Sequence, residues 1–228
     1  MNETTSMGQP AGRGVNSFPP GYHDDVRRDV APYVPAAGGT LLDVGGGTGA
    51  TAAHFRSLGL AERVGAVDRI SSDLADPSVD FHESGDLEDQ GFLATVIERH
   101  GPFQTILCLD ILEHLVDPWR VIETLHHALV PGGRIVASIP NVRHYRVSGG
   151  LFLRNRWHLM DSGILDRTHL RFFVKETAIE LMTHTGLELE EVVTPDRGRH
   201  PRLARTAQHL GLGSLVAVDY VVRVRRSD

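Results

Sequence analysis

The sequence predicts an α/β fold, in which a mostly parallel sheet is covered by helices on both faces. Between residues 40 and 140, short apolar runs alternate with stretches of helical periodicity. The first apolar run leads directly into a glycine-rich turn, "VGGGTG". Strands that alternate with helices in this way pair in parallel. A chain of 228 residues, 41% of them hydrophobic, is also long enough for one sizeable core.

Five apolar runs in this region have the length and composition of buried strands. They are "TLLDV", "RVGAVD", "VDFHES", "TILCLD" and "GRIVASIP", at residues 40–44, 63–68, 79–84, 105–110 and 133–140. Three segments between them have apolar residues at helical spacing, at residues 48–58, 88–99 and 117–129. This order of elements is typical of a sheet with helical crossovers.

The regions on either side of this core have different patterns. Residues 1–20 are rich in Gly, Pro, Ser, Asn and Thr, and we expect a flexible tail there, followed by one domain over residues 21–228. Residues 22–34 space valines as a short amphipathic helix would. Residues 141–173, here called the lid segment, are irregular and rich in arginine, histidine and aromatic residues. We also predict a helix at 175–185 and strands near 187–193 and 215–224. In the last of these strands, alternation of Val and Tyr predicts that only one of its two faces is covered by the core.

Composition excludes several classes of protein. The formal net charge of −6 argues against a surface built to neutralise nucleic-acid phosphates, so no nucleic-acid partner is expected. Cys108 is the only cysteine, which excludes an intramolecular disulfide and a cysteine-based zinc cluster. No signal-peptide pattern and no apolar run of about 20 residues is present, so we expect a cytoplasmic protein without a membrane partner.

The glycine loop narrows the choice of ligand. A strand, a tight glycine turn and a helix N-terminus together form a site where backbone N–H groups face a nucleotide-like ligand. The phosphate loop of NTPases is excluded, because no Gly-Lys-Ser/Thr follows. A dinucleotide site matches through Gly45, Gly47 and Ala50 on spacing alone. Asp43 counts against it, because a carboxylate beside the loop repels a pyrophosphate but can hold a cationic amino-acid group through water.

"LLDVGGGTGA" resembles the first motif of class I S-adenosylmethionine-dependent methyltransferases. "VGAVD", "SGDLED", "TILCLDILEHLVDP" and "LVPGGRIVASIPN" resemble the following motifs of that family in order. The resemblance covers residues 40–193 and implies a Rossmann-like, seven-stranded, mostly parallel sheet, with the last strand antiparallel beside the fifth. It also implies that Asp68 takes the ribose hydroxyls and Asp86 the adenine amino group. The full set of cofactor-binding candidates is Asp43, Gly45, Gly46, Gly47, Asp68, Arg69, Asp86, Leu87 and Leu109. For Asp86, an ordinary helix N-cap remains an alternative.

The candidate catalytic residues follow the fourth predicted strand. Methyl transfer to an alcohol requires alignment of the nucleophile and removal of its proton. Asp110, Glu113 and His114 come at the carboxyl edge of the sheet, and His169 lies in the lid segment. His114 is the favoured base, oriented by a carboxylate. The same four residues resemble the metal site of methyltransferases that modify the terminal ribose of small RNAs, with Asp110 where that family has Glu. A divalent metal is therefore an alternative, but the metal-free mechanism is favoured.

The lid segment is expected to contact the methyl acceptor. It contains six arginines against two aspartates, which suggests a small, possibly anionic acceptor; pairing of these arginines with acids on the sheet rim is the alternative. The substrate-binding candidates are Arg143, His144, Tyr145, Arg154, Arg156 and Trp157. "GILDRTHLRFF" resembles a stretch of bacterial methyltransferases of glycan and natural-product assembly. O-methylation of a sugar or natural-product-type molecule is the first hypothesis; an RNA 2′-O-methyltransferase or a non-catalytic cofactor-binding partner are the rivals. The acceptor and the oligomeric state stay open.

Overall fold

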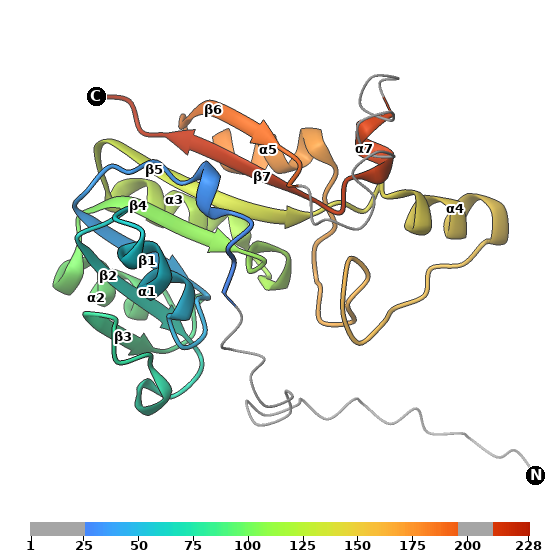
Figure 1. Ribbon diagram of the computed structural model, residues 1–228. Helices are drawn as coiled ribbons and strands as arrows, with labels where there is room; N and C mark the ends of the chain where they lie inside the picture. Colours follow the sequence, from blue (N-terminus) through green and yellow to red (C-terminus); the bar gives the residue numbers. More distant parts are fainter. Residues whose placement is uncertain (1–25, 196–211) are drawn as a thin grey trace, which may run out of the picture.

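The computed structural model describes residues 26–195 and 212–228, and its ribbon is shown in Figure 1. The predicted tail at 1–20 and the first residues of the predicted helix at 22–34 lie outside the described residues. The described chain folds around one seven-stranded sheet with helices on both faces. None of the described helices is long and apolar enough to cross a bilayer.

The strand order confirms the predicted Rossmann-like α/β class. The sheet runs β3-β2-β1-β4-β5-β7-β6, and β7 pairs antiparallel with both of its neighbours. The other adjacent pairs, from β3 to β5, are parallel. The strands are β1 Thr40–Val44, β2 Arg63–Asp68, β3 Phe81–Ser84, β4 Phe103–Leu109, β5 Leu129–Pro140, β6 Glu188–Val193 and β7 Asp219–Arg225. The carboxyl ends of the parallel strands therefore meet at one edge, where this fold class holds its ligands.

The helices divide between the two faces of the sheet. Their bounds are α1 Ala50–Ser57, α2 Gln90–His100, α3 Pro118–Ala128, α4 Tyr145–Arg154, α5 Lys175–Thr183 and α7 Gly213–Val216. Buried residues of α2, α3 and α5 belong to one core cluster, and those of α1 belong to a second cluster with the N-terminal segment. The side chain of Asp89 caps α2 by accepting from the N–H groups of Gly91 and Phe92. The alternative role of Asp86 as the cap of this helix is therefore wrong.

The predicted N-terminal helix is not an α-helix in its described part. Only a 3-10 turn forms, at Ala31–Tyr33, and Pro32 lies in this first turn, where it supplies no backbone N–H group. The valines were nevertheless correctly expected to face inward. Val30 and Val34 are buried against Leu41 and Phe55. The spacing of the valines therefore predicted correctly that Val30 and Val34 are buried, but the backbone forms a 3-10 turn rather than an α-helix.

Two further expectations need correction. The lid segment, expected to be irregular, contains α4, whose first turn is capped by the His144 side chain accepting from the Arg146 N–H. Gly149 and Gly150 inside α4 weaken its sequence signal, because glycine is a poor helix former. The last strand, β7, was expected to be half-covered. It is buried on both faces, because Val221 packs into one core cluster and Val222 into the other.

Candidate active site

The glycine loop between β1 and α1 presents backbone rather than side chains at the carboxyl edge of the sheet. Gly45, Gly47 and Gly49 have φ values of 72°, 56° and 85°, which favour glycine. A Cβ atom on Gly45 would lie 2.5 Å from Cγ1 of Ile111, and one on Gly46 would lie 2.6 Å from Cγ of Asp43. Neither position has room for a side chain larger than that of glycine. The loop therefore presents its backbone to a ligand, close to the Asp43 side chain. These features fit a nucleoside with a cationic amino-acid group.

Asp43 lies beneath this loop and is only 2% exposed. Burial raises its pKa to about 7, the neighbouring charge of Asp68 adds to the rise, and Arg27 opposes it. A carboxyl that titrates near neutral pH is easily converted to its charged form by a nearby cation. This residue could therefore hold the ammonium group of a cofactor, as the sequence predicts.

Asp68, at the end of β2, braces the glycine loop. Its Oδ2 accepts from the N–H of Gly47 at 2.9 Å, and its Oδ1 accepts from the N–H of Ile70 at 3.1 Å. A carboxylate offers about four acceptor positions, so capacity remains for ribose hydroxyls. Asp68 is thus in the right place for the predicted cofactor contact and has a structural role that sequence reasoning did not foresee.

Arg69 and Asp86 form an ion pair beside the loop. Arg69 Nη2 lies 2.7 Å from Asp86 Oδ2, and both side chains are largely exposed. The other oxygen, Asp86 Oδ1, accepts from the Glu88 N–H at 3.0 Å, and this bond, with Arg69, lowers the pKa of Asp86. Leu87, which follows, is buried. The ion pair joins the segments after β2 and β3, where the sequence predicts the adenosine half of the cofactor.

Arg27 is the main residue of this region that sequence reasoning missed. Its guanidinium, 14% exposed, pairs with Asp29 and Asp110, donates to Ser138 Oγ at 3.0 Å, and lies 3.7 Å from Asp219. Asp110 has a φ of 53°, which is uncommon for a residue other than glycine. The hydroxyl of Ser138 also donates to Asp110 Oδ1 at 2.7 Å. Asp110 is therefore tied to Arg27 and to Ser138 of β5.

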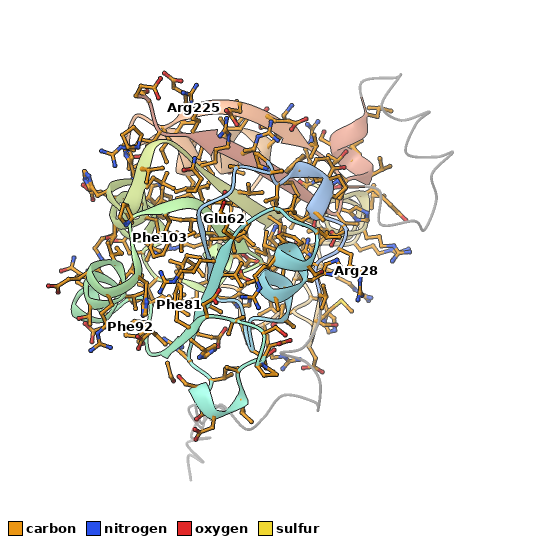
Figure 2. The ribbon with its side chains drawn as sticks, turned by 60° about the vertical axis from the view of Figure 1, so that its left-hand side comes forward. Arg28, Glu62, Phe81, Phe92, Phe103 and Arg225 are labelled. Atoms are coloured by element: carbon orange, nitrogen blue, oxygen red, sulfur yellow. The ribbon has the colours of Figure 1, made fainter. Side chains whose placement is uncertain are left out.

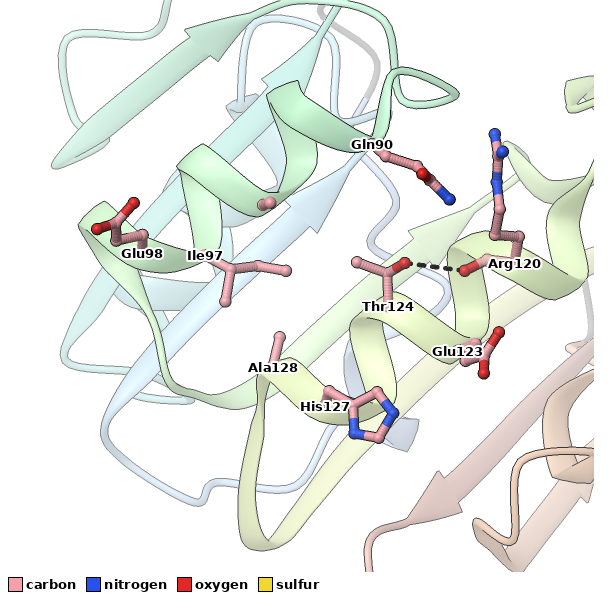
Figure 3. A pocket seen from close by; sticks show the side chains of 9 residues that line it. Gln90, Ile97, Glu98, Arg120, Glu123, Thr124, His127 and Ala128 are labelled. Carbon is pink, nitrogen blue, oxygen red and sulfur yellow. Dashed lines mark hydrogen bonds between the residues drawn. The ribbon is translucent and has the colours of Figure 1, made fainter.

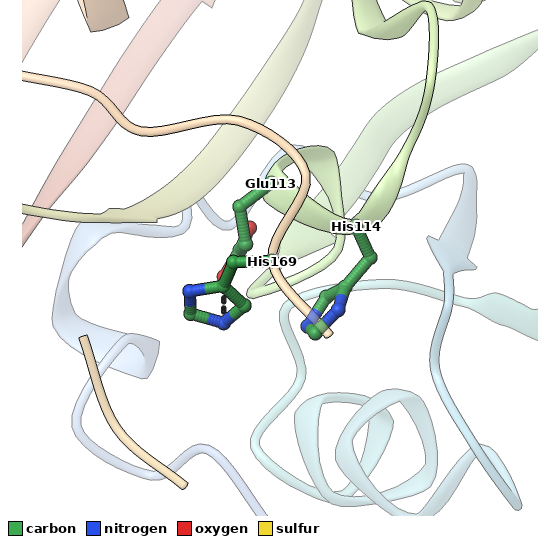
Figure 4. A group of neighbouring side chains, drawn as sticks. All are labelled: Glu113, His114 and His169. Atoms are coloured by element: carbon green, nitrogen blue, oxygen red, sulfur yellow. Dashed lines mark ion pairs between the residues drawn. The ribbon is translucent and has the colours of Figure 1, made fainter. Parts of the chain in front are cut away.

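Glu113, His114 and His169 form a compact cluster (Figure 4), with one ligand atom from each lying within 4.8 Å of the others. The His114 and His169 ring centroids are 4.7 Å apart, and His169 Nε2 lies 3.9 Å from Glu113 Oε1. The lid segment brings His169 here, because the N–H groups of Leu170 and Arg171 both donate to the Glu113 carbonyl. Three of the four predicted catalytic residues thus meet; Asp110 is not part of this group.

Hydrogen bonds fix which imidazole nitrogens face the cluster. His169 Nδ1 contacts the Ile164 carbonyl at 3.1 Å, and a carbonyl can only accept, so Nδ1 carries the proton. Thr168 Oγ1 donates to Asp166 at 2.7 Å, so at its 3.2 Å contact with His114 Nδ1 it accepts. Burial lowers the pKa of both histidines. Both rings are therefore neutral at pH 7, and each presents a bare Nε2 lone pair.

The Glu113 carboxyl group is buried without hydrogen bonds to the described chain. It is 1% exposed, and neither carboxyl oxygen has a hydrogen-bond partner among the described residues. Burial and the charge of Asp110 raise its pKa well above the usual value. A buried polar group without partners is destabilising and requires an explanation. The two bare imidazole nitrogens beside it suggest either a shared proton or a bound cation.

The substrate-binding candidates are spread along the lid segment rather than gathered. At its base, Arg143 donates to Ser214 Oγ at 2.9 Å, His144 is buried, and Tyr145 is half exposed. Further along, Arg154 and Arg156 are exposed and make no ion pair with a described residue, and the Trp157 ring packs edge-on against Phe172. The expected alternative, in which these arginines pair with acids on the sheet rim, is not seen among the described residues. Of the six lid arginines, Arg167 alone forms an ion pair with a described residue, Asp161 of the same segment.

A groove lies between α2 and α3 (Figure 3). It is lined by Gln90, Ala94, Ile97, Glu98, Arg120, Glu123, Thr124, His127 and Ala128. Its walls are outer helical faces, and Thr124 Oγ1 uses its proton on the Arg120 carbonyl of its own helix. None of the candidate catalytic or cofactor-binding residues lines it, so the carboxyl edge remains the candidate site.

Comparison with known proteins agrees with this geometry. A family model described as a methyltransferase domain matches residues 20–192. A ubiquinone biosynthesis O-methyltransferase of Azotobacter vinelandii is 34% identical over 207 residues, which cover 87% of this chain and 83% of that protein. One of Xylella fastidiosa is 32% identical over 124 residues, and the match spans about half of its length, 48%, and 51% of this chain.

Two solved structures show the same fold. An S-adenosylmethionine-dependent methyltransferase of Mesorhizobium loti superposes with a TM-score of 0.56 at 19% identity, over 87% of this chain and 98% of that one. A Burkholderia thailandensis N1-methyltransferase, solved with bound S-adenosylhomocysteine, gives a TM-score of 0.57 at 17% identity over 88% and 78% of the chains. With the family-model match, these findings exclude the dinucleotide alternative. The chain belongs to the methyltransferase-domain family, and its fold is that of S-adenosylmethionine-dependent methyltransferases.

Proposed function

We propose that this chain transfers the methyl group of S-adenosylmethionine to a hydroxyl of a small-molecule acceptor, with His114 as the general base. The observation that carries the proposal is the bare, neutral Nε2 of His114 at the carboxyl edge of the sheet. His114 follows β4 in the same turn as Ile111, which packs against Gly45 of the predicted cofactor loop. A neutral imidazole can accept the hydroxyl proton as the new C–O bond forms. Thr168 holds the ring in the required tautomer through the Nδ1 side.

The cofactor contacts of this proposal use the loop and its acids. Asp43 would hold the ammonium group, Asp68 the ribose hydroxyls, and the Arg69–Asp86 pair would border the adenine. When bound, S-adenosylmethionine supplies an electrophilic methyl group on a positive sulfur. The chain's own contribution is alignment and removal of one proton, because the leaving thioether is neutral.

Two considerations support an O-methyl acceptor of small size. The curated relatives at about one third identity carry the name of O-methyltransferases in ubiquinone biosynthesis. The lid segment places Arg143, His144 and Tyr145 close to the end of β5, where they could contact an acceptor, an anionic one in the case of Arg143. Sugars and natural-product-type molecules with a free hydroxyl remain the other acceptors to test.

A second mechanism has one specific observation in its favour. The buried Glu113 carboxyl lacks partners beside two bare imidazole nitrogens, and a divalent cation held by Glu113, His114 and His169 would satisfy all three groups. Such a cation would lower the pKa of a coordinated hydroxyl. Metal-free proton transfer remains the favoured mechanism. Asp110 is one of the four residues that resemble a metal site, but it pairs with Arg27 instead of joining the cluster.

The proposal is tested by a methyl-transfer assay with labelled S-adenosylmethionine. The acceptor panel should contain hydroxylated ubiquinone precursors, hydroxylated natural-product-type molecules, sugars, and matched amines that lack a hydroxyl. We expect transfer to at least one hydroxylated acceptor and loss of transfer to its deoxy analogue. Transfer to an amine but to no hydroxyl would overturn the proposal. The matched control is Thr124→Ala, in the groove between α2 and α3, which should keep wild-type turnover.

A further inference from the structure

The carbonyl of Gly47, in the middle of the glycine loop, is held by a side chain from the third strand. His82 of β3 lies with its Nε2 2.8 Å from this carbonyl oxygen. A carbonyl can only accept a hydrogen bond, so Nε2 carries a proton and donates it. Gly47 is itself buried, and a buried backbone carbonyl needs a partner. His82 therefore satisfies a backbone group of the loop, and no sequence motif marks this role.

The place of His82 in β3 directs its side chain to the loop. Phe81, labelled in Figure 2, packs into the core cluster that α2 and α3 share. Successive residues of a strand point to opposite faces of the sheet, so His82 faces the other way, toward the loop before α1. Its second nitrogen, Nδ1, lies 3.2 Å from Oγ of Ser72, in the 3-10 helix Ser72–Leu74. The strand and the 3-10 helix together therefore hold the imidazole ring in place.

Two neighbouring strands hold the two polar groups of Gly47. Its N–H donates to Asp68 Oδ2, at the end of β2, and its carbonyl accepts from His82 of β3. Glycine loses more conformational freedom on ordering than any other residue, so a loop built on it depends on contacts from outside to keep one conformation. Because the two bonds hold the two peptide planes that meet at Gly47, they orient the backbone that faces a ligand.

The chain between β2 and β3 makes further contacts with the loop. The Asp76 N–H donates to the Thr48 carbonyl at 2.8 Å, and a Cβ atom on Gly49 would lie 2.8 Å from Cγ1 of Val79. Of these contacts and that of His82, only the last uses a polar side chain. A substitution of His82 can therefore remove one hydrogen bond to the loop and leave the other contacts in place.

We propose that His82 is a positioning residue for the methyl-donor cofactor. By donating to the Gly47 carbonyl, it holds the glycine loop in the conformation that receives S-adenosylmethionine, and binding then costs less ordering of the loop. Because His82 acts through the loop, its effect is on cofactor affinity rather than on the transfer step. This inference rests on the cofactor position in the proposed function and does not depend on the identity of the acceptor.

Two amide substitutions at position 82 separate the Nε2 donor from the rest of the ring. The side-chain nitrogen of glutamine lies about as far from the backbone as Nε2 of histidine, so His82→Gln can still donate to the Gly47 carbonyl. The nitrogen of asparagine corresponds to Nδ1, so His82→Asn can meet Ser72 but cannot reach Gly47. We expect His82→Asn to weaken binding of S-adenosylhomocysteine by roughly three- to tenfold, the effect of one hydrogen bond. His82→Gln should bind within roughly twofold of the wild type.

Titration calorimetry with S-adenosylhomocysteine and thermal unfolding of the ligand-free, full-length chain measure these effects. The loss of one hydrogen bond should lower the melting temperature by only roughly 2–4 °C in a chain of this size, so calorimetry at room temperature compares folded proteins. His127→Asn, an exposed position on α3, is the matched histidine control and should bind like the wild type. A lower melting temperature with wild-type affinity in His82→Asn would show a role in folding alone and would overturn the inference.

The affinities of the two amide variants decide between the remaining outcomes. Equal losses in His82→Gln and His82→Asn would overturn the inference, because the donor position would then be irrelevant. Wild-type affinity in Asp68→Ala would remove the cofactor from this loop, and the inference would fall with that part of the proposed function. A loss in Asp68→Ala without one in His82→Asn would overturn the inference alone. Absence of transfer to every hydroxylated acceptor would overturn the proposed function, while the expected difference between the amide variants would still support the role of His82.

Discussion

The backbone N–H of Gly47 donates to Asp68 Oδ2 at 2.9 Å, which joins the first glycine loop to the end of the neighbouring strand. This bond makes one carboxylate both a brace of the loop and the proposed ribose ligand. Because β1 and β2 pair in parallel, with Val44 opposite Val67, both elements reach the same edge of the sheet. Loss of the Asp68 carboxylate should therefore affect the binding site and the loop together.

Asp68→Ala should weaken binding of S-adenosylhomocysteine by about 1.5–3 kcal/mol, as expected for hydrogen bonds to a charged group. The loss of the Gly47 and Ile70 bonds should also lower the melting temperature. Titration calorimetry and thermal unfolding measure the two effects separately. Asp73→Ala, which removes an exposed acid of the 3-10 helix Ser72–Leu74, is the control and should change neither. Wild-type affinity in folded Asp68→Ala protein would refute the assignment.

Asp43 should make stability and cofactor affinity depend on pH in opposite directions. Its pKa is raised from 3.8 to about 7 in the folded chain. The stabilisation from the protonated form is therefore fully present below the unfolded pKa and is lost as pH rises through about 7. The shift corresponds to about 4 kcal/mol, and Asp43→Asn should remove this part of the pH dependence. Denaturant unfolding of the ligand-free protein at several pH values measures it.

Affinity for the cofactor should instead improve with pH, because the ammonium group favours the charged carboxylate. Between about pH 6 and about pH 7.5, calorimetry should show tighter binding of S-adenosylhomocysteine by the wild type. Asp43→Asn should bind more weakly and with a flat profile in this range. A wild-type profile that is flat, or that falls with pH, would contradict the proposed contact.

Arg27 should be important for stability because three acids surround it. Burial lowers its pKa, but the hydrogen bond to Asp29 and the charges of Asp110, Asp29 and Asp219 outweigh this effect. Arg27→Met would leave these carboxylates together without a cation, and we expect a loss of about 3 kcal/mol in the free energy of unfolding. A second substitution, Asp110→Asn, should recover part of the loss. Chemical denaturation measures both, with exposed Arg28→Met as control; equal losses in the two arginine variants would contradict this role.

The sequence predicted the parallel strands and the glycine loop because local patterns determine both. Buried strands appear as apolar runs, and the tight approach at Gly45 and Gly46 leaves room only for glycine. Arg27 could not be predicted, because its contact with Asp110 spans 83 residues and no motif surrounds it. The same limit explains Asp110, which was grouped with His114 by sequence proximity although Arg27 and Ser138 hold it. Helix α4 was not predicted because Gly149 and Gly150 lower the helical propensity of its sequence. Hydrogen bonds of Asn141, just before the helix, hold its base in place, and these contacts cannot be predicted from local sequence.

The final prediction separates the two mechanisms proposed for Glu113, His114 and His169. For a base mechanism His114 must be neutral, and burial lowers its pKa, so turnover should be constant near neutral pH and fall only on acidification below the usual histidine pKa. Turnover should also survive EDTA, and His114→Ala should reduce kcat by roughly 10²–10⁴-fold.

A cation mechanism has a different signature. Turnover would vanish with EDTA and return with Mg²⁺ or Mn²⁺, and calorimetry with Mn²⁺ alone would show binding that Glu113→Gln and His169→Ala both remove. The two histidine variants provide the sharpest comparison, because both rings belong to the cluster with Glu113 but only His114 is the proposed base. Without a cation, His169→Ala should lower kcat much less than His114→Ala. With one, both should lose activity to a similar extent, since each would remove a ligand. His126→Ala, in the last turn of α3 and outside the cluster, is the matched histidine control. Full activity in both cluster variants would contradict both mechanisms and would leave alignment of the acceptor as the source of the rate.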